Sequence, residues 1–227
     1  MVAVANTGLR CGPSCVYRSC VWCNLLLSVT DYINFLTEEV EKIDQRFATQ
    51  RVVFYGSSAE RTKLFQLDEF DFLVVLSNFA EESGQSGRVI YCGINSNQAE
   101  FLSLGDGKRD ISSGRALYYF YQLLRAATKR VTCFNIHVRD ITFGETCTTL
   151  YLCYCGYGQI IPISIDITIG IARSSSCELE KKIEKELPPW CHITKSQNPE
   201  ASEYLVPFRD KCGPPEWRVS YPSLEVS

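Results

Sequence analysis

The sequence predicts an α+β (α/β) domain with a mixed, largely antiparallel sheet flanked by helices. Three observations predict it: a long amphipathic helical pattern near the N-terminus, short apolar runs alternating with a second helical pattern, and a late run in which β-branched and polar residues alternate. The chain has 227 residues, of which 45% are hydrophobic and 22% charged. That composition is typical of a globular domain.

The first predicted element is a long spine helix over residues 24–47, because apolar residues recur there at intervals of three and four. Its polar positions are mainly acidic: Asp31, Glu38, Glu39, Glu41 and Asp44 against Lys42 and Arg46. The chain as a whole has a net charge of −3. Surfaces that bind duplex nucleic acid usually carry a basic stripe. Double-stranded DNA is therefore a poor candidate partner for this helix.

Residues 1–23 precede the helix and contain Cys11, Cys15, Cys20 and Cys23. This segment has two readings. It is either a poorly ordered N-terminal segment or a zinc site, for which only Cys20 and Cys23 have a common ligand spacing. It lacks the pattern of a secretory signal, and no apolar run in the chain is long enough to cross a membrane.

Cysteine usage indicates a reducing, cytoplasmic location. Twelve cysteines in 227 residues are too sparse for a small disulfide-stabilised scaffold. Cys92, Cys153 and Cys155 fall within predicted strands, where we expect buried free thiols that pack as small apolar groups.

A strand at residues 51–55 is expected to lead into a turn at Gly56, Ser57 and Ser58. Backbone N–H groups of such a small-residue turn can bind a phosphate, although the same tripeptide also forms ordinary turns.

The next strand, residues 70–76, is preceded by Glu69 and contains Asp71. Alternate strand residues project to one face, so these carboxylates should lie side by side. They repel each other unless a cation lies between them, and Mg²⁺ takes such oxygen ligands together with substrate phosphates. The alternative is a solvated polar face.

The middle of the chain predicts a polar loop at 78–87, a strand at 89–94 and a loop at 95–113. A helix over 115–131 is expected to be capped by Ser112 or Ser113. Strands are expected at 134–142, 148–154 and 219–221, and a short helix at 178–186.

Residues 160–172 form the clearest strand pattern, in which isoleucines alternate with polar or small residues. Asp166 lies in the middle of the polar face. Because aspartate is disfavoured within strands, its position calls for compensation, and a metal site shared with Glu69 and Asp71 would supply it. The alternative is an exposed aspartate on an edge strand.

The Gly-Ser turn, the Glu69-x-Asp71 strand and the Asp166 strand, in this order, resemble the signature of the nucleotidyltransferase superfamily. With residues 216–225, the set resembles cyclic GMP-AMP synthase-like receptors and the related male-abnormal (Mab) developmental proteins. The resemblance covers residues 24–226 and implies a nucleotidyltransferase fold, with 24–227 as the catalytic lobe. It further implies an innate immune enzyme that joins ATP and GTP into a cyclic dinucleotide.

The resemblance also implies roles for individual residues. Glu69, Asp71 and Asp166 would hold Mg²⁺ or Mn²⁺. The donor triphosphate would lie against Gly56 and Ser57, with Ser58 as a further contact. Arg218 and Ser220 would contact the acceptor base, and Glu225 the nucleotide or its metal environment.

The sequence departs from the family pattern in three places. Arg61 stands where family members often have glycine, and Pro222 where active synthases can have a polar residue. The chain ends at Ser227, before the helical second lobe of the relatives, so a truncated fragment is one expectation. The alternative function is that of a catalytically inactive Mab-type scaffold that acts through protein interaction. Double-stranded RNA is a candidate activating ligand that the sequence neither identifies nor excludes.

Overall fold

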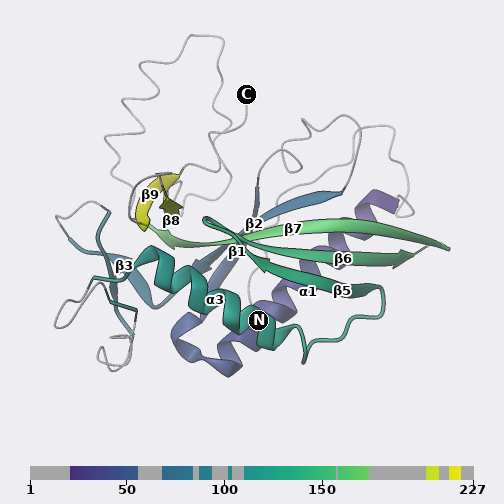
Figure 1. Ribbon diagram of the computed structural model, residues 1–227, viewed down its shortest axis with the longest axis horizontal. Coiled ribbons are helices and arrows are strands. Elements are labelled where there is room, and N and C mark those ends of the chain that lie inside the picture. The colour runs from purple at the N-terminus through teal and green to yellow at the C-terminus, as the bar shows by residue number, and fades with distance from the viewer. Residues whose placement is uncertain are drawn as a thin grey trace, which may run out of the picture.

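One sheet forms the middle of the molecule in the computed structural model, which describes residues 21–55, 68–83, 87–93, 102–103, 110–156, 158–173, 203–209 and 215–220. Its central strands lie in the order β1 (Thr49–Tyr55), β2 (Glu69–Leu76), β7 (Gln159–Ala172), β6 (Thr148–Gly156) and β5 (Ile136–Phe143) (Figure 1). Within this path, β2 and β7 pair in parallel and the other neighbours are antiparallel. The expected mixed, largely antiparallel sheet of an α+β fold is confirmed.

Two helices, α1 (Val21–Ile43) and α3 (Ser113–Ala127), lie next to each other on one face of this sheet (Figure 1). The core fills the space between the helix layer and the sheet. Phe70 and Phe72 of β2 and the isoleucines of β7 point into it and are almost completely buried. The alternating apolar pattern of β2 and β7 therefore decides which face the helices cover.

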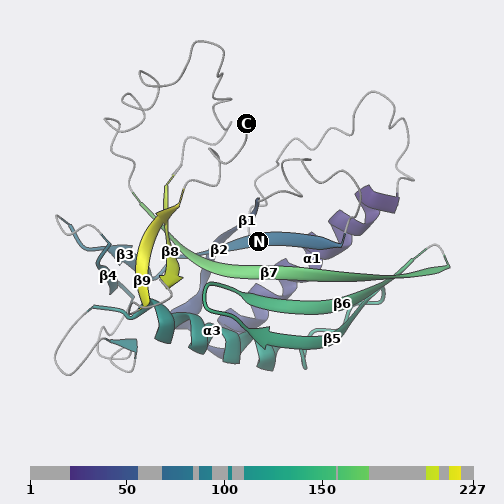
Figure 2. The same ribbon diagram turned by 45° about the horizontal axis from the view of Figure 1, so that its top comes forward.

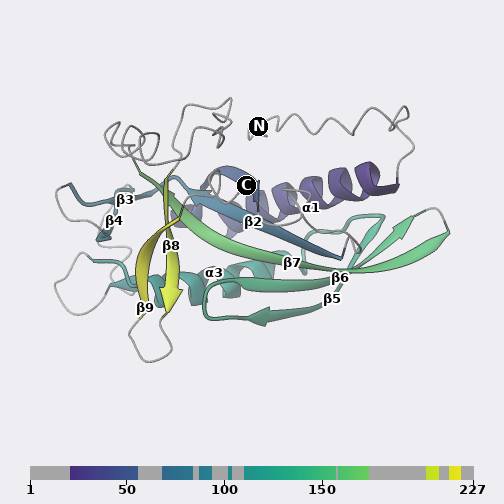
Figure 3. The same cartoon turned by 90° about the horizontal axis from the view of Figure 1, so that it is seen from above.

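The opposite face of the sheet is covered at one end by a ribbon of two further strands, β8 (Tyr204–Arg209) and β9 (Pro215–Ser220). Strand β8 pairs with the end of β7, and the ribbon crosses the sheet there (Figure 2; Figure 3). Tyr204 packs with Leu73 and Val75 to form a second, small apolar cluster. The rest of this face carries the polar residues of β2 and β7.

The two helices match their expected positions with shifted ends. The spine helix ends at Ile43 rather than at residue 47, because the carboxylate of Asp44 accepts a hydrogen bond from the backbone N–H of Arg46. That cap starts a separate 3₁₀ turn, Gln45–Phe47. Ser112 caps α3, as expected, by accepting from the N–H of Arg115.

Three expectations about strands and loops were wrong. Part of the predicted loop at 78–87 forms β3 (Phe79–Glu81), which pairs with β4 (Val89–Tyr91). Strand β8 was not predicted, because Pro207 within it weakens the strand signal. The edge-strand reading of Asp166 fails because β7 lies between β2 and β6.

The described cysteines, Cys92, Cys133, Cys147, Cys153 and Cys155, are free thiols. Cys153 is buried, but Cys92 is exposed rather than buried because β4 ends one residue before it. Cys11, Cys15, Cys20 and the predicted helix at 178–186 lie outside the described residues, as does the side chain of Cys23. Neither described helix combines the length and apolar composition that crossing a membrane requires.

Gly170 of β7 leaves room for the side chain of Leu73 on the neighbouring strand β2. A Cβ atom at this position would lie 2.6 Å from Cδ1 of Leu73, which is fully buried. We predict that Gly170→Ala lowers the free energy of unfolding by about 1–3 kcal/mol, the usual cost of overpacking a core, as measured by urea denaturation.

The Leu73→Ala background is the control. Removing the leucine methyl groups makes room for the new Cβ, so Gly170→Ala should cost less there. An equal cost in both backgrounds would show that the contact with Leu73 is not the cause.

Candidate active site

Four polar side chains lie in one row across the sheet. Asp71 of β2 is directly opposite Asp166 of the parallel strand β7, and Asp166 is directly opposite Thr149 of β6. On the other side, Tyr55 of β1 pairs with Asp71. Because residues in register on neighbouring strands project to the same face, ~4.8 Å apart, the row brings two carboxylates and two hydroxyl groups together.

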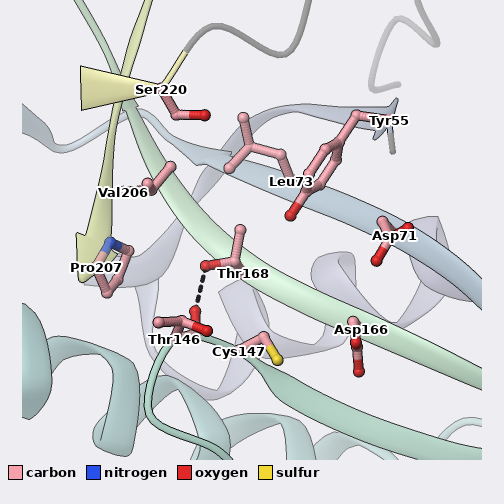
Figure 4. Close-up of a pocket in the computed structure, with 10 residues that line it drawn as sticks. All are labelled: Tyr55, Asp71, Leu73, Thr146, Cys147, Asp166, Thr168, Val206, Pro207 and Ser220. Carbon is pink, nitrogen blue, oxygen red and sulfur yellow. Dashed lines mark hydrogen bonds between the residues drawn. The ribbon is translucent and has the colours of Figure 1, made fainter. Parts of the chain in front are cut away.

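The row borders a cavity of about 230 Å³ between the sheet and the β8–β9 ribbon (Figure 4). Its polar side is formed by Asp71, Asp166, Thr146, Cys147 and Thr168, and Ser220 of β9 also lines it. Its apolar side is formed by Leu73, Val206 and Pro207, with the ring of Tyr55. The cavity therefore offers acidic groups and an apolar wall to one small ligand.

Thr149 orients the carboxylate of Asp166. Its Oγ1 donates a hydrogen bond to Oδ1 of Asp166 at 2.6 Å. The bond is short because the acceptor is a carboxylate, and it joins two residues that the β6–β7 pairing already places opposite each other. The threonine thereby supports one of the two acids that line the cavity.

The turn between β5 and β6 brings Cys147 to the same place. Oγ1 of Thr168 donates to the carbonyl oxygen of Thr146 at 2.6 Å and holds this turn against β7 (Figure 4). Burial raises the pKa of the Cys147 thiol, and the negative charges of Asp166 and Asp71 raise it further, against the opposing effect of hydrogen bonds with Thr149 and Thr146. At neutral pH the group is a thiol, not a nucleophilic thiolate.

The predicted acidic trio is placed on one face but not drawn into one cluster. Asp71 and Asp166 line the cavity, whereas Glu69 is exposed, two residues along β2 and opposite Ser164. Within the described ranges, no three His, Cys, Asp or Glu side chains are grouped closely enough to hold a metal ion.

Of the remaining predicted site residues, one lines the cavity, one does not, and four lie outside the described residues. Ser220 lines the cavity, as expected of a ligand contact. Arg218 is exposed on the same ribbon, with its guanidinium carbon 4.6 Å from the ring centre of Phe208, and does not line the cavity. Gly56, Ser57, Ser58 and Glu225 lie outside the described residues.

Sequence reasoning missed Tyr55, Thr149 and Cys147. Tyr55 immediately precedes Gly56 in the sequence, a predicted site residue, so its proximity to the site could have been inferred from chain position. Thr149 and Cys147 carry no spacing signal, because strand register and the turn before β6 bring them to Asp166.

The raised pKa of Cys147 yields a prediction for thiol chemistry. Asp166→Asn removes a negative charge that raises the thiol pKa, so that pKa should fall and the thiolate fraction at a given pH should rise. We expect alkylation of Cys147 by iodoacetamide at pH 8 to become severalfold faster, as measured by peptide mass spectrometry.

Two controls accompany this measurement. The exposed thiol of Cys92 reports general reactivity within the same sample, and Asp140→Asn changes an exposed carboxylate on β5. Unchanged alkylation of Cys147 in Asp166→Asn, or an equal change at Cys92, would contradict the electrostatic coupling.

Comparisons with protein-family models and with curated protein sequences give no match for this chain.

Proposed function

We propose that the chain is a metal-dependent nucleotidyltransferase whose reaction centre is the Asp71–Asp166 pair. The observation that carries the proposal is the register of β2 and β7, which puts these carboxylates opposite each other at the side of a cavity. Two adjacent acids beside a cavity suit metal-assisted phosphoryl transfer, because its catalysis is mainly positioning and charge stabilisation.

The donor set fits a hard divalent cation. Asp71 and Asp166 offer carboxylate oxygens, which Mg²⁺ and Mn²⁺ prefer, whereas the sulfur of Cys147 suits softer metals. Glu69 is the third ligand on the family resemblance alone, because it lies on the same face of β2 but does not line the cavity. When bound, the metal would act as a Lewis acid that lowers the pKa of an attacking ribose hydroxyl and stabilises the leaving pyrophosphate.

The other residues of the cavity bind and orient the substrate in this proposal. Thr149 fixes the Asp166 carboxylate, and Ser220 offers a hydroxyl group from the ribbon. The apolar side, including Leu73 and Val206, excludes water and packs against a base or ribose. ATP and GTP are the proposed substrates and a cyclic dinucleotide is the proposed product, on the family resemblance of the sequence.

Covalent catalysis by Cys147 is an alternative function for the same cavity, and the cavity favours it less. A nucleophilic cysteine needs a lowered pKa or an adjacent base. Burial and the neighbouring carboxylates raise the pKa of this thiol instead. The carboxylates that would hold a cation therefore also lower the fraction of Cys147 that is present as thiolate.

The test is conversion of labelled ATP and GTP with Mg²⁺ or Mn²⁺, with and without double-stranded RNA. Asp71→Asn and Asp166→Asn should each lower the rate at least ~1,000-fold, because a metal contributes several kcal/mol and ~1.4 kcal/mol is tenfold. Thr149→Val should lower it ~10–100-fold, since it only supports a ligand. Asp140→Asn on β5 is the matched control and should keep full activity.

Metal binding is measured separately, by the electron paramagnetic resonance of Mn²⁺ titrated with folded protein. Retained activity in Asp166→Asn, or Mn²⁺ binding unaffected by both substitutions, would refute the proposal. Absence of product together with absence of Mn²⁺ binding would favour the Mab-type scaffold that acts through protein interaction.

A further inference from the structure

The outer surfaces of the two helices carry opposite charges. Helix α1 contains four acidic side chains and one lysine, whereas α3 contains two arginines and no acidic side chain. Glu39 of α1 is engaged within the chain by Lys42 at 3.3 Å and by Arg130 at 3.1 Å. Asp31, Glu38 and Glu41 are the acidic residues at the other polar positions of α1.

Basic residues follow one face of α3 and the turn after it. Arg115 and Arg125 of α3 and Lys129 of the turn after it are exposed, so they face away from the core. The nearby pair Glu39–Arg130 joins α1 to the end of this segment. The acidic and basic surfaces therefore lie next to each other on a single helix layer.

Large apolar side chains are exposed among these charges. Leu27 is 61% and Phe35 54% exposed on α1, and Tyr118 is 51% exposed on α3. Tyr118 contacts Phe143 of β5 edge to face, with ring centres 5.3 Å apart. Large exposed apolar side chains among charged residues are a feature of protein interfaces.

We propose that this helix layer is a docking surface for a second copy of the chain, with α1 of each protomer on α3 of its partner. Because α1 and α3 lie side by side, a two-fold axis between them would bring both acidic helices onto both basic helices in one step. Leu27, Phe35 and Tyr118 would then be buried between the layers.

The surface has a suitable size. At ~1.5 Å per residue, α1 extends over ~35 Å and α3 over ~22 Å. With helix widths of ~10 Å, the layer offers ~570 Å² in projection, of the same order as the ~800 Å² that each partner buries in a standard interface.

A second copy fits this surface better than a polyanion does. Nucleic acid that followed the basic residues of α3 would also meet the acidic residues of α1, and the two would repel each other. A second copy would place basic residues opposite the acidic surface of α1 and acidic residues opposite the basic surface of α3. The cavity lies on the other face of the sheet, so self-association and the proposed reaction can be tested independently.

The test is sedimentation velocity of the chain at ~1–100 µM, in ~50 mM and ~500 mM salt, because screening weakens surface charge pairs. We expect a dimer at low salt whose dissociation constant rises at least tenfold at high salt. Asp31→Lys/Glu38→Lys should weaken association at least tenfold, and so should Arg125→Glu/Lys129→Glu. The fourfold variant that combines both reversals should restore it.

Apolar contact is tested by Leu27→Ser, which should also weaken the dimer. The control is Ile160→Ser, which changes a similarly exposed residue of β7 and should leave the dimer unchanged. Circular dichroism confirms that each variant is folded. A monomer at all concentrations, or a dimer indifferent to the charge reversals, would overturn the proposal. So would a monomeric wild type that binds double-stranded RNA through Arg125 and Lys129.

Discussion

The parallel pairing of β2 with β7 is the constraint on which both the core and the candidate site depend. In register, Phe70 and Phe72 point to the same face as Ile165 and Ile167 and are buried under the helices. The same register necessarily puts Asp71 opposite Asp166 on the other face. A slip of one residue would bury the acids and expose the aromatic rings, so burial of the apolar face enforces the position of the carboxylates.

The acidic face is tolerated because its surroundings are polar and partly open. Thr149 donates to Asp166, and the β8–β9 ribbon covers only one end of the sheet. That ribbon is tied to the sheet by charge as well as by packing. Arg173, at the end of β7, binds Glu81 at 2.6 Å and the buried Glu203 at 3.0 Å, directly before β8. Since a buried carboxylate needs a partner, this contact anchors the start of the ribbon.

The two faces of the sheet serve different purposes in the functions proposed for this chain. The face with Asp71 and Asp166 borders a cavity that suits a small charged ligand, whereas the helix layer on the other face presents broad, complementary charges. Burial raises the pKa of the Cys147 thiol first, and the negative charges of Asp166 and Asp71 raise it further. In the proposed function, the same negative charges would attract the cation.

The sequence by itself determined the local elements that strong periodicity encodes. The spine helix and the alternating isoleucines of β7 follow from the spacing of apolar residues, and the Ser112 cap follows from the residue type at a helix start. Asp71 and Asp166 were identifiable as acids within strands. Only the tertiary structure decided which strands pair, and hence that Tyr55, Thr149 and Cys147 lie at those acids. Strand β8, the exposure of Cys92 and the separation of Glu69 from the cavity were likewise decided there. The physical reason is that register and layer packing are contacts between distant segments, which local periodicity does not encode.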